Sequence, residues 1–464
     1  MSSSNPEQVL DPGYLKAATA VAASDANGID AGSTSKKAAR WATKGGLAIL
    51  DQGLISGSNF LIGILLARWL VPAEYGAFSL AFSVFLLLSY VYQSLLSEPQ
   101  AVFSGSAYRR CLRGYLKALL SIQLVVTVFG LVLLGGSATL VYLLGDADGL
   151  PGALAGVAIA SPCILFLWLM RRSYYMNLAP ARAAMGAFIY FVMVVSGLLF
   201  AYKRALISPF SAYLLMAIGA LVAGLFLLTQ VKKVLPPDAC DPPTAAQAWH
   251  KHWEYGRWAL AVSVVTWIPY YMYYPLVSAF RGMAAAGQLK ALMNLSLPME
   301  QSYTALAILF LPYAARVCRE KGISSSGPLV RRIILLFVGG AVLYWGLLIP
   351  FRGVVFHVLY GGKYMEVTPL IPYVALGTTM WSAAFGPAIL LRAIESPHLI
   401  FYARLVASIL SLIVGVPATK MFGLWGVVIS IIVANIAAFV ISMYILRRKS
   451  NSASLPNPVL QGES

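Results

Sequence analysis

Polar side chains recur along one face of an otherwise apolar segment, residues 46–69. Gln52, Ser56 and Asn59 follow the spacing of a single helical face, which Gly63 continues. Asp51 lies beside this stripe, and its carboxylate could bind a proton or an ion, or set the charge of a cavity. The stripe predicts either a cavity wall that faces water or a contact with a second helix, to which Gly53 and Gly57 would add a pair of small residues.

Three arginines at the ends of apolar segments could bind an anion: Arg68, Arg257 and Arg281. A guanidinium group matches phosphate oxygens in bidentate geometry, which makes arginine the favoured cation for such a ligand. Arg257 is the first candidate because it lies just inside its apolar segment. The alternatives are an ordinary anchor at the helix end for Arg257 and snorkelling side chains for the other two.

Five aromatic side chains cluster around two prolines, Pro269 and Pro275; they are Trp267, Tyr270, Tyr271, Tyr273 and Tyr274. Sugars stack on aromatic faces, so Tyr270 is a candidate for contact with a saccharide. The alternative is an interfacial belt, because tyrosine and tryptophan also gather where a membrane meets water.

The histidines and cysteines do not indicate a metal or cofactor site. We expect His250 and His252 to be solvated loop residues. The cysteines are scattered without short spacings, so they predict neither a zinc site nor a disulfide framework; they are Cys111, Cys163, Cys240 and Cys318. No G-x-x-x-x-G-K-[ST], G-x-S-x-G or H-E-x-x-H motif occurs, and we therefore expect neither an ATP engine nor an enzyme.

The composition is that of a membrane protein. Of the 464 residues, 59% are hydrophobic and 11% are charged, and the mean hydropathy is +0.76. Soluble chains carry about 45–50% apolar and about 25% charged residues. This composition excludes a soluble enzyme, a nucleic-acid reader and a disordered scaffold. The net charge of +17 then indicates basic cytoplasmic loops and not a nucleic-acid partner.

Twelve apolar stretches are long enough to cross a membrane, which takes about 20 residues of helix. They predict an all-α polytopic membrane protein. The stretches are 46–69, 76–97, 116–144, 150–170, 183–202, 208–230, 256–279, 294–314, 333–351, 368–391, 399–418 and 422–446.

The basic residues alternate between the loops on the two sides. With the N-terminus inside, 26 of the 34 lysines and arginines fall on the inner side and 8 on the outer side. Because basic loops stay in the cytoplasm, both termini are predicted to be cytoplasmic. Arg392 and Arg404 belong to the inner set, and we expect them to be solvated.

A proline-rich connection predicts two six-helix halves. The expected parts are a disordered cytoplasmic tail (1–44), a first bundle (45–230), a cytoplasmic linker (231–254), a second bundle (255–448) and a second disordered cytoplasmic tail (449–464). Because six is even, the halves should be parallel repeats about an axis along the membrane normal. At an offset of 211 residues, Gly287 falls on Gly76.

Several segments resemble the lipid-linked oligosaccharide flippases, also called O-antigen or polysaccharide transporters. They are LLARWLVPAEYGAFSLAFSVF (65–85), AGQLKALMNLSLPMEQSYTALAILFLP (286–312), GGKYMEVTPLIPYVAL and FGLWGVVISIIVANIAAFVISMYILRR. The resemblance covers about residues 45–448 and consists of loose apolar patterns with fixed glycines and prolines. This family belongs to the multidrug/oligosaccharidyl-lipid/polysaccharide transporter superfamily, which also holds multidrug antiporters and lipid II flippases.

The resemblance implies two six-helix bundles around a central cavity that opens alternately to each side. It implies a bacterial inner-membrane transporter, without cofactor or metal, that flips a polyprenyl-pyrophosphate-linked oligosaccharide to the outer leaflet. Its partners would be this substrate, membrane lipid and polysaccharide polymerase or export proteins. The expected cavity residues are Asp51, Gln52, Asn59, Arg68, Arg257, Tyr270 and Arg281. Two alternatives stay open: a multidrug or cation antiporter with Asp51 as its ion site, and a membrane-embedded glycan polymerase.

Overall fold

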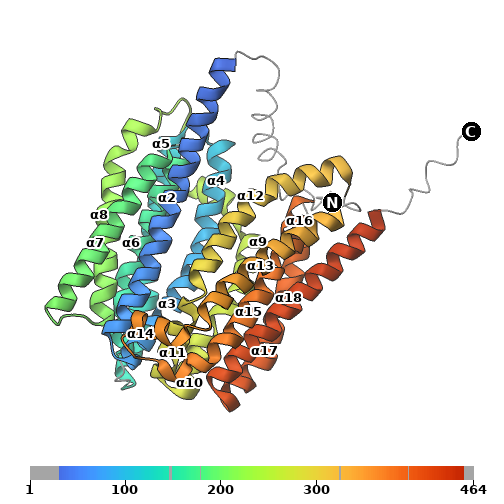
Figure 1. Cartoon of the computed structure of the whole chain (residues 1–464). Coiled ribbons are helices and arrows are strands. Elements are labelled where there is room, and N and C mark those ends of the chain that lie inside the picture. Colours follow the sequence, from blue (N-terminus) through green and yellow to red (C-terminus); the bar gives the residue numbers. More distant parts are fainter. Residues whose placement is uncertain (1–30, 146–148, 178, 323–325, 395–396, 454–464) are drawn as a thin grey trace, which may run out of the picture. The chain divides into compact units, whose positions relative to one another are not determined.

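The computed structural model describes residues 31–145, 149–177, 179–322, 326–394 and 397–453, which form helices joined by short connections and contain no strand. The helices before the proline-rich connection (Figure 1) are α2 (Ala31–Trp69), α3 (Pro72–Tyr92), α4 (Glu98–Gly105), α5 (Leu112–Leu143), α6 (Leu150–Tyr175), α7 (Pro180–Lys203) and α8 (Pro209–Val234). Those after it are α9 (Ala245–Tyr271), α10 (Tyr273–Arg281), α11 (Met283–Asn294), α12 (Leu297–Lys321), α13 (Gly327–Leu348), α14 (Arg352–Tyr360), α15 (Ile371–Ala383), α16 (Phe385–Ala393), α17 (Pro397–Phe422) and α18 (Leu424–Ala453).

Eleven helical segments in the described residues are long and apolar enough to cross a membrane, which confirms the all-α polytopic fold class. The expected stretch 294–314 is not among them. It falls in α12, where Glu300 and Gln301 interrupt the apolar run near the start of the helix. α6 continues through its internal Pro162, as a helix in a membrane protein can when its neighbours satisfy the freed backbone groups.

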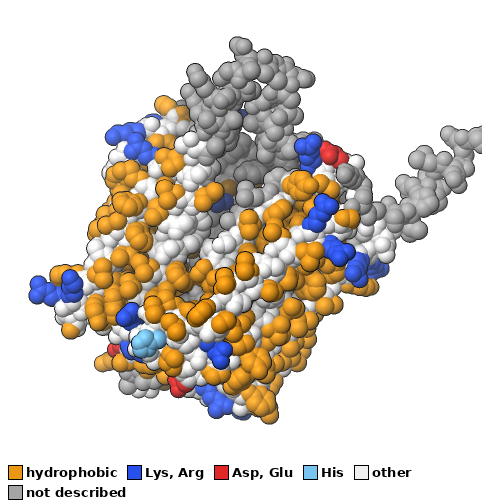
Figure 2. All heavy atoms as spheres, in the orientation of Figure 1, with side chains coloured by type: hydrophobic (Ala, Val, Ile, Leu, Met, Phe, Trp, Pro, Cys, Tyr) orange, Lys and Arg blue, Asp and Glu red, His pale blue; other side chains and the backbone are white. Residues whose placement is uncertain are grey.

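The surface of the spanning helices is apolar. On α5, Val125 and Val132 are 69% and 70% exposed, and Phe129 is 65% exposed. Figure 2 shows hydrophobic side chains over much of the visible face. Water would not tolerate contiguous apolar surface of this extent, so lipid is the environment that the side chains fit.

The tails differ from expectation at both ends. α2 begins at Ala31, so residues 31–44 are helical where a disordered tail was expected. α18 likewise continues to Ala453, beyond the expected boundary at residue 449. Both helices continue into polar residues beyond the apolar stretch. A count of apolar residues alone does not detect such an extension. The rest of the two expected tails, residues 1–30 and 454–464, lies outside the described residues.

The helices form two compact units whose boundaries lie inside helices. Unit 1 comprises the described residues up to Ile62 and Val84–Ser263, and unit 2 comprises Gly63–Ser83 and the described residues from Val264 onwards. The expected division at the proline-rich linker is therefore displaced. The end of α2 and the start of α3 pack with the second half of the chain, and the start of α9 packs with the first half.

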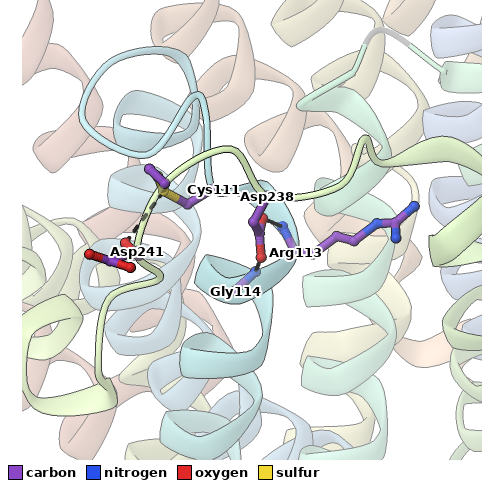
Figure 3. Close-up of a disulfide and its surroundings, with 6 residues drawn as sticks. Cys111, Arg113, Gly114, Asp238 and Asp241 are labelled. Atoms are coloured by element: carbon purple, nitrogen blue, oxygen red, sulfur yellow. Dashed lines mark hydrogen bonds between the residues drawn. A yellow bond between two sulfur atoms is a disulfide. The ribbon is translucent and has the colours of Figure 1, made fainter.

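In unit 1, the connection after α8 is fastened to the start of α5 (Figure 3). Asp238 accepts hydrogen bonds from the backbone nitrogens of Arg113 (2.9 Å) and Gly114 (2.8 Å), which satisfies two N–H groups that the helix itself cannot pair. Cys111 and Cys240 form a disulfide, with their Cα atoms 5.7 Å apart. The sequence predicted no disulfide framework, and this pair was missed because 129 residues separate its members and no local spacing marks them.

His252 also differs from its expected place in a solvated loop. It lies on α9 and is fully buried in unit 1, where its Nε2 is 2.7 Å from the Tyr115 hydroxyl and its Nδ1 is 2.8 Å from the Leu95 carbonyl oxygen. The helix begins at Ala245, earlier than the apolar run, and this brings the polar WHKHW tract into a helix. His252 is therefore a hydrogen-bonded packing residue.

In unit 2, the two glycines that the 211-residue offset equates lie against one another. A Cβ built on Gly76 would be 1.8 Å from the Met283 carbonyl oxygen, and one built on Gly287 would be 2.5 Å from the Pro72 carbonyl oxygen. Because Met283 is the offset partner of Pro72, the two contacts are reciprocal, as at a twofold axis. This reciprocity supports the predicted repeat and requires glycine at both positions.

Candidate substrate-binding pocket

A pocket of about 100 Å³ lies within unit 2 and is formed by α9, α12, α15, α16, α17 and α18. Its lining combines small residues, aromatic residues, a few polar groups and two arginines. The residues are Thr266, Pro269, Tyr270, Ala307, Trp381, Ala384, Phe385, Ala388, Ile389, Arg392, Ile400, Ala403, Arg404, Ala407, Ala434, Asn435, Ala438 and Ser442. Seven of these are alanines, and the space exists because so many facing positions carry a single methyl group.

The pocket is cationic. Arg392 comes from the last turn of α16 and is exposed, as expected, and Arg404 comes from the third turn of α17. Arg404 is half-buried, and its Nη1 donates to the Thr266 hydroxyl oxygen at 3.1 Å. None of the described lining residues is acidic. The sequence-based expectation that Arg404 is solvated was wrong, although Arg404 lies inside the apolar stretch 399–418, and that position was the available signal.

An aromatic wall adjoins the arginines. Trp381 and Phe385 meet edge to face with ring centroids 4.7 Å apart, and Tyr270 also lines the pocket. Asn435 donates from its amide to the Gly377 carbonyl oxygen at 3.0 Å, which holds its side chain at the pocket. Tyr270 is the member of the expected cavity set that contributes to this pocket.

Asp51 takes part in a buried ion pair in unit 1. Its two carboxylate oxygens accept from Arg171 Nε at 3.0 Å and Nη2 at 2.7 Å, and one also accepts from the Tyr175 hydroxyl at 2.8 Å. The Asp51 side chain is 2% exposed and that of Arg171 is 10% exposed. Arg171 lies 120 residues away in the chain. The pair joins α2 to α6, and an ion-coupling role for Asp51 stays a prediction.

The polar stripe of α2 is exposed at two of its positions. Gln52 and Asn59 are exposed, and Gln52 donates from Nε2 to the Ser56 hydroxyl oxygen at 3.3 Å. A Cβ on Gly53 or Gly57 would meet no described atom within 4 Å. A helix–helix contact through these glycines is therefore not formed here, and lining of a cavity by Gln52 and Asn59 stays a prediction.

The three arginines expected at helix ends do not lie in the pocket. Arg68 donates to the Val358 carbonyl oxygen at 3.0 Å, and Arg281 donates to those of Lys420 (3.1 Å) and Met421 (2.8 Å), at the C-terminal turn of α17. A cation at a helix C-terminus satisfies carbonyl groups that have no partner within the helix. Arg257 is exposed, 5.9 Å from the centroid of the Trp258 ring.

Lys363 occupies a similar position at the end of α2. Its Nζ donates to the carbonyl oxygens of Arg68 at 2.9 Å and Leu70 at 2.8 Å. Burial lowers the pKa of the Lys363 ammonium group below its ordinary value, and the charge of Glu74 opposes that shift. The basic residues at this end of unit 2 thus close helix termini.

No protein-family model and no curated protein matches the sequence. Solved structures do match. The chain is similar to an inward-facing multidrug resistance MATE family transporter of the MOP superfamily, with a TM-score of 0.73, 13% identity, and coverage of 88% of this chain and 98% of that one. It is also similar to a MOP superfamily transporter from Pyrococcus furiosus (TM-score 0.64, 12% identity, 88% and 95% covered). A third match is the lipid II flippase MurJ in an inward closed conformation (0.63, 14%, 87% and 88%).

These matches cover most of each chain while the identities stay low, so they bear on the arrangement of helices. They agree with the all-α polytopic class of the described residues. The chain has the fold of the MOP superfamily transporters.

Proposed function

We propose that the protein is a membrane transporter that flips an anionic, lipid-linked oligosaccharide, with a polyprenyl pyrophosphate carrier, from the cytoplasmic to the outer leaflet by alternating access. The observation that carries the proposal is the polarity of the unit 2 pocket: it has two arginines, and none of its described lining residues is acidic. The fold shared with transporters, among them a lipid II flippase, supports the same function.

The pocket disfavours the alternative of a cationic drug as substrate. At an effective dielectric constant of about 20, a cation within about 4 Å of one guanidinium group would be repelled by about 4 kcal/mol. An anion at the same place would be attracted by a comparable amount, and the aromatic wall of Tyr270, Trp381 and Phe385 offers faces on which sugars can stack. A cation antiporter would need an acidic site, and Asp51 already accepts from Arg171 and Tyr175.

The proposed membrane and the side on which the termini lie follow from the distribution of basic residues. We propose a bacterial inner membrane with both termini cytoplasmic, because 26 of 34 basic residues then lie on the inner side. Polysaccharide polymerase or export proteins would receive the flipped product.

Reconstitution of the full-length chain into proteoliposomes tests the function. A fluorescent polyprenyl-pyrophosphate oligosaccharide in the outer leaflet is chemically quenched at intervals, and a cationic dye is assayed in parallel under a proton or sodium gradient. We expect the protein to raise the rate of lipid-linked oligosaccharide movement above that of protein-free vesicles and to leave dye movement unchanged. Gradient-driven dye movement without oligosaccharide movement would establish the antiporter instead.

A further inference from the structure

We propose that the alanine-lined pocket of unit 2 is a diphosphate subsite, in which Arg404 and Arg392 bind the phosphate oxygens and the aromatic wall holds the adjoining sugar. The proposal rests on the proposed function and assigns its substrate contacts to residues of α16 and α17. It differs from the sequence-based expectation, which placed anion binding at Arg68, Arg257 and Arg281.

The first step of the argument is the charge of Arg404. This side chain is half-buried among Ile400, Ala403 and Ala407, within an apolar stretch of α17. Its hydrogen bond goes to the neutral Thr266 hydroxyl group, and no described acidic side chain lies within ion-pair distance of it. A partly desolvated guanidinium group without a counter-charge is costly in a membrane protein, so an anion that entered the pocket would gain a strong, charge-assisted partner.

The second step is a comparison with Arg171, a buried arginine of unit 1. Arg171 has the carboxylate of Asp51 in bidentate geometry. Arg404 instead opens into a space that contains no protein atoms. The contrast suggests that the counter-ion of Arg404 is a ligand, and Thr266 would orient the guanidinium group before the ligand arrives.

The third step is the match of shape and chemistry around that charge. Arg392 brings a second positive charge to the same pocket, which suits a group with two phosphates more than one with a single negative charge. Trp381 and Phe385, packed edge to face, line the same pocket and present an apolar aromatic wall to it. Asn435 and Ser442 add polar groups that sugar hydroxyls can reach.

Binding of inorganic pyrophosphate to the purified full-length protein tests the charge assignment, with calorimetry as the readout and sulfate as the control anion. We expect Arg404→Ala to weaken pyrophosphate binding at least tenfold. Arg404→Lys should weaken it less, because lysine keeps the positive charge but cannot donate the paired hydrogen bonds of a guanidinium group. Arg331→Ala and Arg332→Ala, which alter exposed arginines of α13 outside the pocket, should bind as the unmodified protein does. Equal binding by Arg404→Ala would overturn the assignment, as would equal affinity for sulfate.

A second pair of variants tests the space and leaves both arginines in place. Ala407→Leu adds three carbon atoms to the pocket wall and should weaken pyrophosphate binding at least tenfold. Ala261→Leu makes the same change at an exposed position of α9 outside the pocket and should have no effect. Unchanged binding after Ala407→Leu would overturn the proposal, whatever the behaviour of the arginine variants.

The flipping assay separates this proposal from the proposed function. If the unmodified protein moves lipid-linked oligosaccharide and the Arg404→Ala and Ala407→Leu variants move it equally well, the subsite is wrong and the function stands. If pyrophosphate binds as expected and the unmodified protein moves no lipid-linked oligosaccharide, the proposed function fails and the pocket remains an anion site for another ligand.

Discussion

Alanine at Gly76 should destabilise unit 2, against the usual effect of this substitution. In an exposed helix interior, Gly→Ala stabilises by up to about 1 kcal/mol because it restricts the unfolded backbone. At Gly76, however, the new Cβ would lie 1.8 Å from the Met283 carbonyl oxygen, where real Cβ atoms stay beyond 3.0 Å. The obstacle is backbone, which cannot rotate away, so α3 and α11 must separate by about 1.2 Å.

Such a separation removes much of the dispersion attraction between the facing atoms, and overpacking of this kind costs about 1–3 kcal/mol. A suitable control is Gly130→Ala on α5, where a Cβ meets nothing within 4 Å. For a unit of this size, each kcal/mol shifts the thermal midpoint by about 2–4 °C. We therefore expect the Gly76→Ala midpoint to lie about 2–12 °C below that of Gly130→Ala, measured by thermal unfolding of the detergent-solubilised protein.

Gly287→Ala provides a symmetry check on the same reasoning. Its Cβ would be 2.5 Å from the Pro72 carbonyl oxygen and 3.1 Å from the Gly76 backbone nitrogen, so its effect should have the same sign and a smaller size. Midpoints for both variants at or above that of Gly130→Ala would refute the close approach of α3 and α11 and, with it, the reciprocal contact.

Three further substitutions test unit 1, each by the same thermal measurement. Asp51→Asn leaves the Arg171 guanidinium group buried without its counter-charge and should cost about 3–5 kcal/mol, whereas the double variant Asp51→Leu/Arg171→Leu should cost less; a larger loss in the double variant would contradict this. Asp238→Ala removes two hydrogen bonds from the start of α5 and should cost about 0.5–2 kcal/mol, while Asp241→Ala, an exposed neighbour, should have little effect. A reducing agent should lower the thermal midpoint of the unmodified protein, and Cys111→Ser should lower it by an amount that corresponds to about 2–4 kcal/mol and abolish the effect of the reducing agent. Cys318→Ser, which alters a free cysteine, should leave that effect intact.

Much of the fold could be predicted from local patterns. A spanning helix is specified by about 20 neighbouring residues, so hydropathy alone located the apolar stretches. Local patterns were less reliable where a helix combines apolar residues with polar or charged ones. They missed the helical continuation over residues 31–44, which carry lysines and an arginine before the apolar run begins. The offset that equates Gly76 with Gly287 was visible in the sequence, but their mutual contact was not.

The candidate site depended on partners that lie far apart in the chain. Asp51 was identified as a notable carboxylate from its apolar surroundings, yet its partner Arg171 is 120 residues away. Arg404 looked like one of many basic residues near a loop until the structure placed it beside Thr266, 138 residues earlier, in a space bordered by alanines.

The amino-acid sequence by itself determined that the chain has helices apolar enough to cross a membrane and where most of them lie, since these properties follow from hydropathy over short windows. The tertiary structure decided which charges are paired and which face a pocket, because the free energy of a buried charge depends on whatever surrounds it in space. Arg171 and Arg404 are the same residue type in similarly apolar helices, and what distinguishes them is the carboxylate beside one and the pocket beside the other.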